Sequence, residues 1–342
     1  PEHVVNFFQF IAEEIRQIMS VIGVCRLEDL IGRPEFLERR KVKLTKTNKV
    51  DLSCLLEPIK EEEDRRWLCH DLNAHSNGEI LENELLNDAQ LMEAINHHGK
   101  ITRNIQILNT DRSVCARISG EIAERHGNKG FKGQLNLNFK GAAGQSFGAF
   151  VIQGMNIQLI GEANDYVGKG INGGRITITP PSMKADIGNQ VILGNTCLYG
   201  ATGGEVFALG RAGERFAVRN SGAQAVVEGA GDHCCEYMTG GVIVVLGSTG
   251  RNVGAGMTGG VTFLLDESNK AIEQVNKEIV GIYKLSNKTQ EIILKTLLEN
   301  HLKWTNSKKA RKIISNWDSW KTKFRILIPP SEEIKLGIES TK

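Results

Sequence analysis

The chain has 342 residues, of which 24% are charged, and its formal net charge is +2. This length allows two or three domains, and a charge so close to zero gives no reason to expect a nucleic acid or an acidic membrane surface as a partner. The sequence holds no run of about 18 apolar residues and no signal-peptide pattern, and its seven irregularly spaced cysteines favour a reducing compartment over a disulfide framework.

The first predicted element is an amphipathic helix. Apolar residues recur every three to four positions over residues 3–19, and Gly23 ends the pattern before a short helical turn at residues 27–34. Residues 35–80 offer mostly charge, so we expect the apolar face of the helix to pack against something outside this sequence. Because the chain starts at Pro1, directly in front of the helix, we expect it to be a piece of a longer protein.

A second predicted helix, at residues 83–98, precedes a change in the hydrophobic period. Apolar and polar residues alternate over residues 101–107, which is typical of a half-buried strand. The chain then becomes rich in glycine, and residues 127–260 hold 30 of its 37 glycines. Seven further short strands are predicted, most of them flanked by glycine: residues 156–160, 175–179, 190–193, 205–209, 223–227, 242–246 and 261–265.

The glycine-rich region contains an internal repeat. Its period, made of one turn and one short apolar strand, is typical of a solenoid whose coils stack on a shared core. Glycines at the coil corners are expected to take positive φ or to let adjacent backbones approach. The longer step of 30 residues from Gly173 to Gly203, which includes Pro180 and Pro181, predicts an irregular corner. The first glycines of four repeats follow at steps of 19, 18 and 19 residues: Gly203, Gly222, Gly240 and Gly259.

The last part of the chain, residues 267–342, turns basic and helical in pattern. It holds 15 Lys or Arg against 9 Asp or Glu, and its apolar residues have helical spacing over residues 292–302 and 313–320. We expect this tail to cap the open end of the solenoid, since a terminal coil exposes an unpaired edge and part of the core. RNA binding, the other meaning of a basic tail with aromatic residues, is disfavoured.

Two segments match the dinucleotide pattern G-x-G-x-x-G, at residues 168–173 and 254–259. In a nucleotide site these glycines open a helix whose N-terminus faces the phosphates. Here each segment runs into a predicted strand, at residues 175–179 and 261–265. Coil corners therefore explain both segments better than a nucleotide site, and a nucleotide-dependent enzyme stays as an alternative that predicts NAD binding.

Two clusters hold metal-ligand residue types. One is His233-Cys234-Cys235, and the other is Cys69-His70-Asp71 with His75. Adjacent cysteines do not readily bind one tetrahedral ion together, and neither cluster has a second pair that completes four ligands. A structural role is therefore favoured over metal binding at both clusters.

Two further segments contain chemically capable side chains. Asp111, Arg112, Ser113 and His126 include the residue types of a nucleophilic triad, but nothing in their spacing brings them together, so turn and cap roles at a strand end are favoured. Residues 164–170 form the most polar part of the repeat, and packing on a neighbouring domain explains them as well as a ligand does.

Several long stretches resemble the large-chain glutamate synthase family. Residues within 1–33 are similar to the last helix of its FMN-binding barrel and the segment that leaves it. The Pro-Pro-Ser-Glu ending at residues 329–332 is closer to the ferredoxin-dependent branch than to the NADPH-dependent branch. The stretches that resemble the family's C-terminal domain are residues 109–123, 127–131, 144–150 and 161–176, and residues 310–317 and 329–333 resemble its terminus.

The resemblance implies a mainly β fold, a right-handed parallel β-helix with an N-terminal helical remnant of an α/β barrel and a C-terminal helical cap. The implied divisions are the end of the FMN-binding barrel at residues 1–40, a linker with helices at 41–100, the glycine-rich β-helix at 101–266 and the helical tail at 267–342.

The family's activity, carried over by resemblance, is the formation of two L-glutamate from L-glutamine and 2-oxoglutarate with electrons from reduced ferredoxin. The implied cofactors are FMN, with FAD as the other flavin, and a 3Fe-4S cluster. The implied partners are ferredoxin and the glutaminase and FMN-barrel domains upstream in the same chain, with no nucleic acid and no membrane. The implied location is the plastid stroma, or the cytoplasm of a cyanobacterium.

The motifs that carry this chemistry in the family are expected to lie before Pro1. They are the glutaminase cysteine, the cluster cysteines and the FMN-phosphate loops. We therefore assign no catalytic, cofactor-binding or metal-binding residue in this sequence and expect this chain alone to be inactive. The alternatives are the large chain of an NADPH-dependent glutamate synthase and a free-standing β-helical assembly subunit, because the resemblance extends weakly to such a subunit of formylmethanofuran dehydrogenase.

Overall fold

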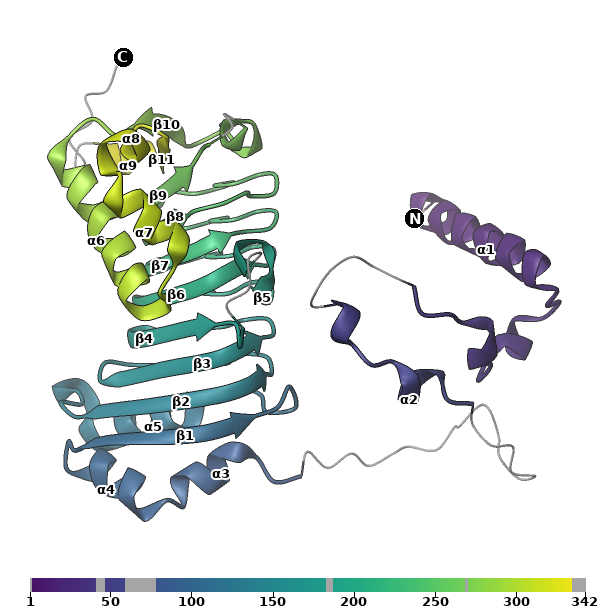
Figure 1. Ribbon diagram of the computed structural model, residues 1–342, viewed down its shortest axis with the longest axis horizontal. Coiled ribbons are helices and arrows are strands. Elements are labelled where there is room, and N and C mark those ends of the chain that lie inside the picture. Colours follow the sequence, from purple (N-terminus) through teal and green to yellow (C-terminus); the bar gives the residue numbers. More distant parts are fainter. Residues whose placement is uncertain (1, 41–46, 59–77, 183–186, 268–269, 334–342) are drawn as a thin grey trace. The chain divides into compact units, whose positions relative to one another are not determined.

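The structure, a computed structural model, describes residues 2–40, 47–58, 78–182, 187–267 and 270–333. The chain divides into two compact units, residues 1–76 and 77–342. Figure 1 labels the elements of both units. Each unit is described by itself.

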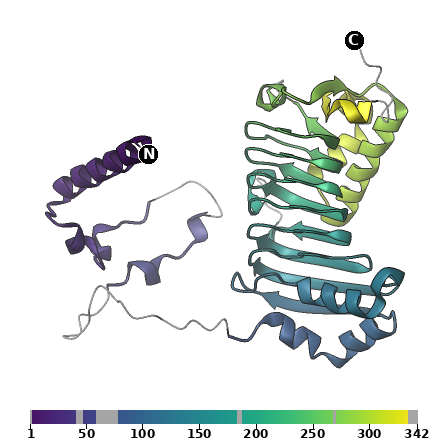
Figure 2. The ribbon, with the colours of Figure 1, turned by 180° about the vertical axis from the view of Figure 1, so that it is seen from behind.

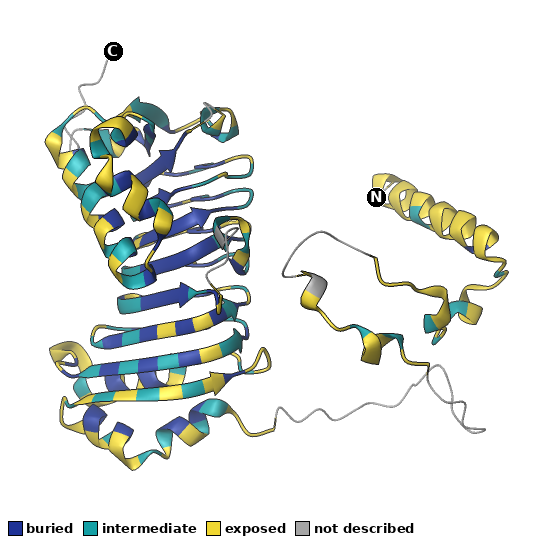
Figure 3. Cartoon of the chain, in the orientation of Figure 1, coloured by how far each residue is buried: buried dark blue, intermediate teal, exposed yellow. Residues whose placement is uncertain are grey.

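The first unit is built around the predicted N-terminal helix, α1 (Glu2–Ile22). Its end is confirmed at Gly23, which has a φ of 75°, and Val24 N–H donates to the Met19 carbonyl at 2.9 Å. Met19 is the one buried residue of α1, and most of the helix is exposed (Figure 3). The other elements of this unit are η1 (Leu27–Leu30), η2 (Pro34–Phe36), η3 (Thr47–Lys49) and α2 (Ser53–Leu56).

The second unit contains an eleven-stranded mixed sheet. Neighbouring strands follow the order β1-β2-β3-β4-β6-β7-β8-β9-β11-β10, and β5 pairs with β3 and β6. All pairs from β1 to β9 are parallel, whereas β11 is antiparallel to both β9 and β10. The strands are β1 (Lys100–Ile107), β2 (Gln134–Ala143), β3 (Met155–Ala163), β4 (Asn172–Thr179), β5 (Val191–Leu193), β6 (Gly203–Ala212), β7 (Ser221–Gly229), β8 (Thr239–Val245), β9 (Gly259–Leu265), β10 (Gly281–Lys284) and β11 (Phe324–Ile328).

Helices lie at both ends of this sheet. Figures 1 and 2 show α3–α5 at the β1 end and α6–α8 along the strands from β6 to β9. Among the described residues, no helix is long and apolar enough to cross a membrane. The helices are α3 (Leu81–Leu86), α4 (Ala89–Asn96), α5 (Ala116–His126), α6 (Lys288–Thr305), α7 (Lys308–Ser315), α8 (Trp317–Lys321) and α9 (Pro330–Glu333), with short η4 (Gly127–Lys129), η5 (Ile187–Asn189) and η6 (Ala271–Gln274).

Most predicted elements are confirmed, and the differences have local causes. The helix predicted over residues 83–98 is two helices, because the Asp88 side chain caps α4 by accepting from the N–H groups of Gln90 and Leu91. The strand β2 and the helix α5 were not predicted. The tail is not only helical, since β10 and β11 continue the sheet beyond β9.

The sheet separates two hydrophobic cores, because successive side chains of a strand point to opposite faces. In β6, Val206 and Ala208 belong to the first core, which runs from α4 and β2 to the β9 end. Phe207, between them, belongs to the second core, beneath α6–α8. The tail was expected to cap the open end of a solenoid. Its cap helices α6–α8 instead cover one face of the sheet at β6–β9, and β11 and β10 extend the sheet beyond β9.

The repeat glycines are required by the close approach of adjacent strands. At each one, an added Cβ would lie 2.1–2.4 Å from a carbonyl oxygen of the preceding repeat, closer than real Cβ atoms come to backbone. The repeat seen in the sequence is therefore a packing constraint. The contacts pair Gly203 with Asn172, Gly222 with Thr202, Gly240 with Ser221 and Gly259 with Thr239.

Candidate functional site

Each of six strands is preceded by a five-residue corner with one conformation. The first, third and fifth residues of every corner have φ between 52° and 74°, the left-handed region. Six of these eighteen positions are glycine, and the other twelve are not, although a left-handed non-glycine residue costs about 1–2 kcal/mol. The corners are residues 146–150, 166–170, 196–200, 215–219, 233–237 and 252–256.

A backbone ladder offsets the cost of this conformation. In four of the six corners the first and fifth amides donate to the following repeat, and in all six the third amide donates to the preceding one. The corner therefore joins three repeats without any side chain. In the corner 233–237 the donors and acceptors are His233 and Arg251 at 2.8 Å, Cys235 and Phe216 at 2.7 Å, and Tyr237 and Ala255 at 2.8 Å.

The two G-x-G-x-x-G segments are parts of these corners. Residues 168–173 lead into β4, and residues 254–259 lead into β9, so a strand follows each as predicted. Their glycines serve the corner conformation. Gly256 also lies against the ring of Tyr237, which would be 2.4 Å from an added Cβ.

In the cluster His233-Cys234-Cys235, the two cysteines belong to the core and His233 is partly exposed. The two sulfur atoms are 3.7 Å apart and both cysteines are buried. The hydrogen bond with Cys235, together with burial, raises the pKa of Cys234 well above its ordinary value, whereas metals bind the thiolate. Within the described ranges, no group of three or more His, Cys, Asp or Glu is arranged to hold a metal ion. Cys69-His70-Asp71 and His75 lie outside the described residues.

The set of Asp111, Arg112, Ser113 and His126 is divided between separate structural roles. Asp111 accepts from the Leu108 N–H at 2.8 Å, which makes it a turn residue at the end of β1. The Nε2 atom of His126 lies 2.6 Å from the Ile95 carbonyl oxygen, and its ring is stacked on His98. Of the contacts made by described residues, none joins His126 to Asp111 or Ser113.

The polar segment 164–170 holds adjacent repeats together. Asp165 Oδ1 accepts from the Asn195 N–H at 2.7 Å. The same bond recurs from Glu214 N–H to Asn195 Oδ1, at 2.8 Å. Gly194 makes the first bond possible, because a Cβ there would be 2.3 Å from Asp165 Oδ1. This staple between repeats was not predicted, although the recurring glycine before Asn195 and Glu214 was a signal for it.

A polar groove crosses the starts of several strands on the outer face of the sheet. Its cavity volume is about 650 Å³, and Asn156, Arg175, Glu205 and Gln224 occupy one register row of β3, β4, β6 and β7. Trp304, near the end of α6, also lines the groove. The guanidinium carbon of Arg175 lies over its indole ring, 3.4 Å from the ring centroid. This groove gathers both charges and amides, which the sequence did not reveal.

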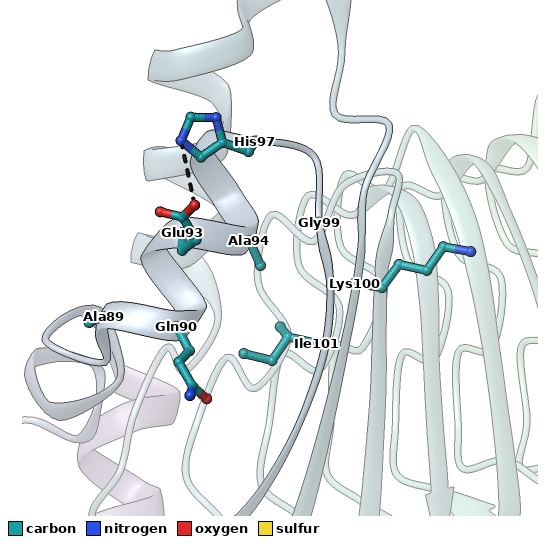
Figure 4. Close-up of a pocket in the computed structure, with 8 residues that line it drawn as sticks. All are labelled: Ala89, Gln90, Glu93, Ala94, His97, Gly99, Lys100 and Ile101. Atoms are coloured by element: carbon teal, nitrogen blue, oxygen red, sulfur yellow. Dashed lines mark ion pairs between the residues drawn. The ribbon is translucent and has the colours of Figure 1, made fainter.

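A second hollow, of about 640 Å³, lies between α4 and the start of β1. Figure 4 shows Ala94 and Ile101 pointing into it, whereas Lys100 points away. Glu93 and His97 form an ion pair at 3.8 Å on its rim, with about three-quarters of each side chain exposed. An exposed pair of this kind is solvated and contributes little to stability.

A buried polar cluster joins the sheet to the helical cap. Glu228 of β7 lies 3.1 Å from His301 Nε2 in α6 and accepts from the Ser307 hydroxyl at 2.6 Å. Burial alone raises the pKa of Glu228, but hydrogen bonds from His301 and Ser307 outweigh it and hold this pKa below its ordinary value. Ser307 bonds to the carboxylate and not to the imidazole, so the three residues do not form a nucleophilic relay.

Comparisons with known proteins place these features in context. A family model described as the GXGXG motif matches residues 82–330. The chain is 52% identical over 335 residues to ferredoxin-dependent glutamate synthase 2 of Synechocystis sp., with 97% of this chain and 22% of that protein covered. It is 48% identical over 336 residues to the chloroplastic ferredoxin-dependent glutamate synthase of Spinacia oleracea, with 97% of this chain and 21% of that protein covered. It is 51% identical over 336 residues to the ferredoxin-dependent glutamate synthase of Antithamnion sp., with 98% of this chain and 22% of that protein covered. The chain thus spans about a fifth of the length of these curated relatives.

Proposed function

The chain belongs to the GXGXG-motif family, and on this premise we propose that it is the C-terminal part of a ferredoxin-dependent glutamate synthase. The observation that carries the proposal is about 50% identity to such enzymes over 97% of this chain. The whole protein would make two L-glutamate from L-glutamine and 2-oxoglutarate with electrons from reduced ferredoxin. FMN and a 3Fe-4S cluster would be its cofactors, held by residues outside this sequence.

In this proposal the second unit is a scaffold. The parallel register from β1 to β9 and six corners of one conformation support a right-handed parallel β-helix over residues 101–266. Residues 267–342 are its cap, and residues 1–40 are the end of an FMN-binding barrel, with 41–100 as the linker. The exposed apolar face of α1 supports this role, because a helix of a barrel needs a sheet to cover.

The proposed location follows from the relatives. Those of Spinacia oleracea and Arabidopsis thaliana are named chloroplastic, and one comes from the cyanobacterium Synechocystis. We place this protein in the plastid stroma, or in the cytoplasm if the source is a cyanobacterium. Ferredoxin and the upstream domains are its partners in either setting.

The test is to isolate the native polypeptide with an antibody against residues 77–342. We expect a polypeptide several times longer than 342 residues, containing flavin and forming glutamate from glutamine and 2-oxoglutarate with reduced ferredoxin. Activity with NADPH but not with ferredoxin would move the protein to the other branch. A native polypeptide of this length, without flavin or turnover, would reject the proposal in favour of a free-standing assembly subunit.

A further inference from the structure

The groove beside Trp304 holds two opposite charges, Arg175 and Glu205, which attract each other without a direct salt bridge. Arg175 and Glu205 are Cα partners in the register of β4 and β6, so their backbones lie about 4.8 Å apart. Among the described residues, however, no salt bridge or hydrogen bond is formed by either side chain.

The Arg175 guanidinium is held in place by the indole of Trp304. Its carbon lies 3.4 Å from the ring centroid, a close cation–π contact. Burial lowers the pKa of Arg175 somewhat, but a guanidinium stays charged at neutral pH. It therefore presents up to five N–H donors from a fixed plane, without an acceptor in the described part of the chain. A guanidinium in this state is suited to a carboxylate, which it binds through two parallel hydrogen bonds.

The rest of the lining consists mainly of amides and glycine backbone. Gln134, Gln153, Asn156 and Gln224 line the same groove, and an amide can both donate and accept hydrogen bonds. Gln134 and Asn156 each also donate to Asn136. The cavity volume of about 650 Å³ is in the range of small-molecule sites. The groove thus offers an anion-binding group, a cation-binding group one strand away, and neutral hydrogen-bonding groups around both.

We propose that this groove binds a free α-amino acid as a zwitterion. Arg175 pairs with the α-carboxylate and Glu205 with the α-ammonium group. These two groups of an amino acid lie close together, as do two side chains on neighbouring strands. The amides of Asn156 and Gln224 suit a side chain that itself forms hydrogen bonds. The site is separate from the chemistry proposed for the whole protein and does not depend on it.

The experiment is a calorimetric titration of the 342-residue chain with L-asparagine. We expect saturable binding to one site. N-acetyl-L-asparagine lacks the ammonium and L-asparagine methyl ester lacks the carboxylate, so each should bind at least tenfold more weakly. Arg175→Lys keeps the positive charge but loses the planar guanidinium with its paired N–H donors. This variant should also bind L-asparagine at least tenfold more weakly.

Glu205→Gln separates recognition from general damage to the groove. This variant should bind L-asparagine at least tenfold more weakly than the wild type does. It should not bind N-acetyl-L-asparagine more weakly, because that compound has no ammonium group to contact Glu205. Arg251→Gln, at an exposed corner outside the groove, is the matched control and should bind as the wild type does. Absence of saturable binding by the wild type, or equal weakening of both ligands by Glu205→Gln in a folded protein, would overturn the proposal.

Discussion

Glu228 of β7 lies 3.1 Å from the Nε2 atom of His301 in α6, and both side chains are buried between the sheet and the cap. The Ser307 hydroxyl, which also caps α7, bonds to the same carboxylate oxygen. One acidic side chain thus holds two cap helices. Removing it affects the attachment of the cap more than the sheet itself.

Glu228→Ala should therefore destabilise the second unit strongly. It removes two buried hydrogen bonds to a charged group, each worth about 1.5–3 kcal/mol, so we expect a loss of about 3 kcal/mol or more in the free energy of unfolding. Glu228→Gln keeps the volume and one acceptor and should lose about half as much. Urea denaturation followed by circular dichroism measures both. Equal stability of Glu228→Ala and the wild type would show that the cluster does not hold the cap.

The same cluster predicts a pH dependence. The folded-state pKa of Glu228 is held below its ordinary value of 4.5, so the unfolded chain binds this proton more readily. The stabilisation is therefore fully present above about pH 4.5 and is lost as the pH falls through the folded-state pKa. The stability advantage of the wild type over Glu228→Gln should shrink as the pH falls below about 4.5. A difference that grows on acidification would contradict the assignment.

Substitutions at Gly222 and Gly200 should have different costs, because an alanine meets a steric clash at Gly222 and only backbone strain at Gly200. A Cβ on Gly222 would be 2.1 Å from the Thr202 carbonyl oxygen, whereas Gly200 has a φ of 63° with no atom within 4 Å of an added Cβ. Gly200→Ala should cost about 1–2 kcal/mol, the cost of a left-handed alanine. Gly222→Ala should cost about 3 kcal/mol or more, because two strands must move apart. Thermal unfolding of the two variants tests the order, and the reverse order would refute it.

The strands of the second unit could be predicted because alternation and flanking glycines are local signals. The four repeat glycines were also visible in the sequence. Glycine recurs at these positions because the close approach of adjacent strands leaves no room for a side chain. β2 carries the same local signal, with Leu135, Leu137 and Phe139 alternating with polar residues. The corners were less readable, because twelve of their eighteen left-handed positions are not glycine.

The groove could not be predicted, because it depends on register between strands. Arg175 and Glu205 each lie two positions after a repeat glycine, Gly173 or Gly203, but the irregular step of 30 residues between those glycines hides the alignment. The position of Trp304 over Arg175 depends in addition on how α6 packs on the sheet. No local pattern records the position of Trp304. The tail's strands β10 and β11 were missed for a similar reason, since they are defined by pairing beyond β9.

Cysteine accessibility should divide the described cysteines into two classes. Cys25 and Cys54 are exposed, and the other four are buried. Burial raises the pKa of Cys197 to about 12, so its thiolate is scarce at pH 8. Iodoacetamide should label Cys25 and Cys54 quickly and the buried four only after unfolding. Peptide mass mapping gives the sites, and fast labelling of Cys234 or Cys235 in the native protein would contradict the core packing.

Residues 77–342 should fold without residues 1–76. Both hydrophobic cores lie almost wholly in this unit, and so do the corner ladder and the Glu228 cluster. A chain from Asn77 to Lys342 should therefore unfold cooperatively with a urea midpoint close to that of the second unit in the full chain.

The full chain should differ from this shortened one in solubility. Phe7, Phe8 and Phe10 of α1 are each more than half exposed, and an apolar helix face in water favours self-association. Size-exclusion chromatography should show larger species for the full chain as its concentration rises, while the chain from Asn77 stays monomeric. Phe7→Glu with Phe10→Glu in the full chain is the matched control and should restore the monomer, because it removes apolar surface without touching the sheet. A shortened chain that is unfolded would show that residues 1–76 are needed for the sheet.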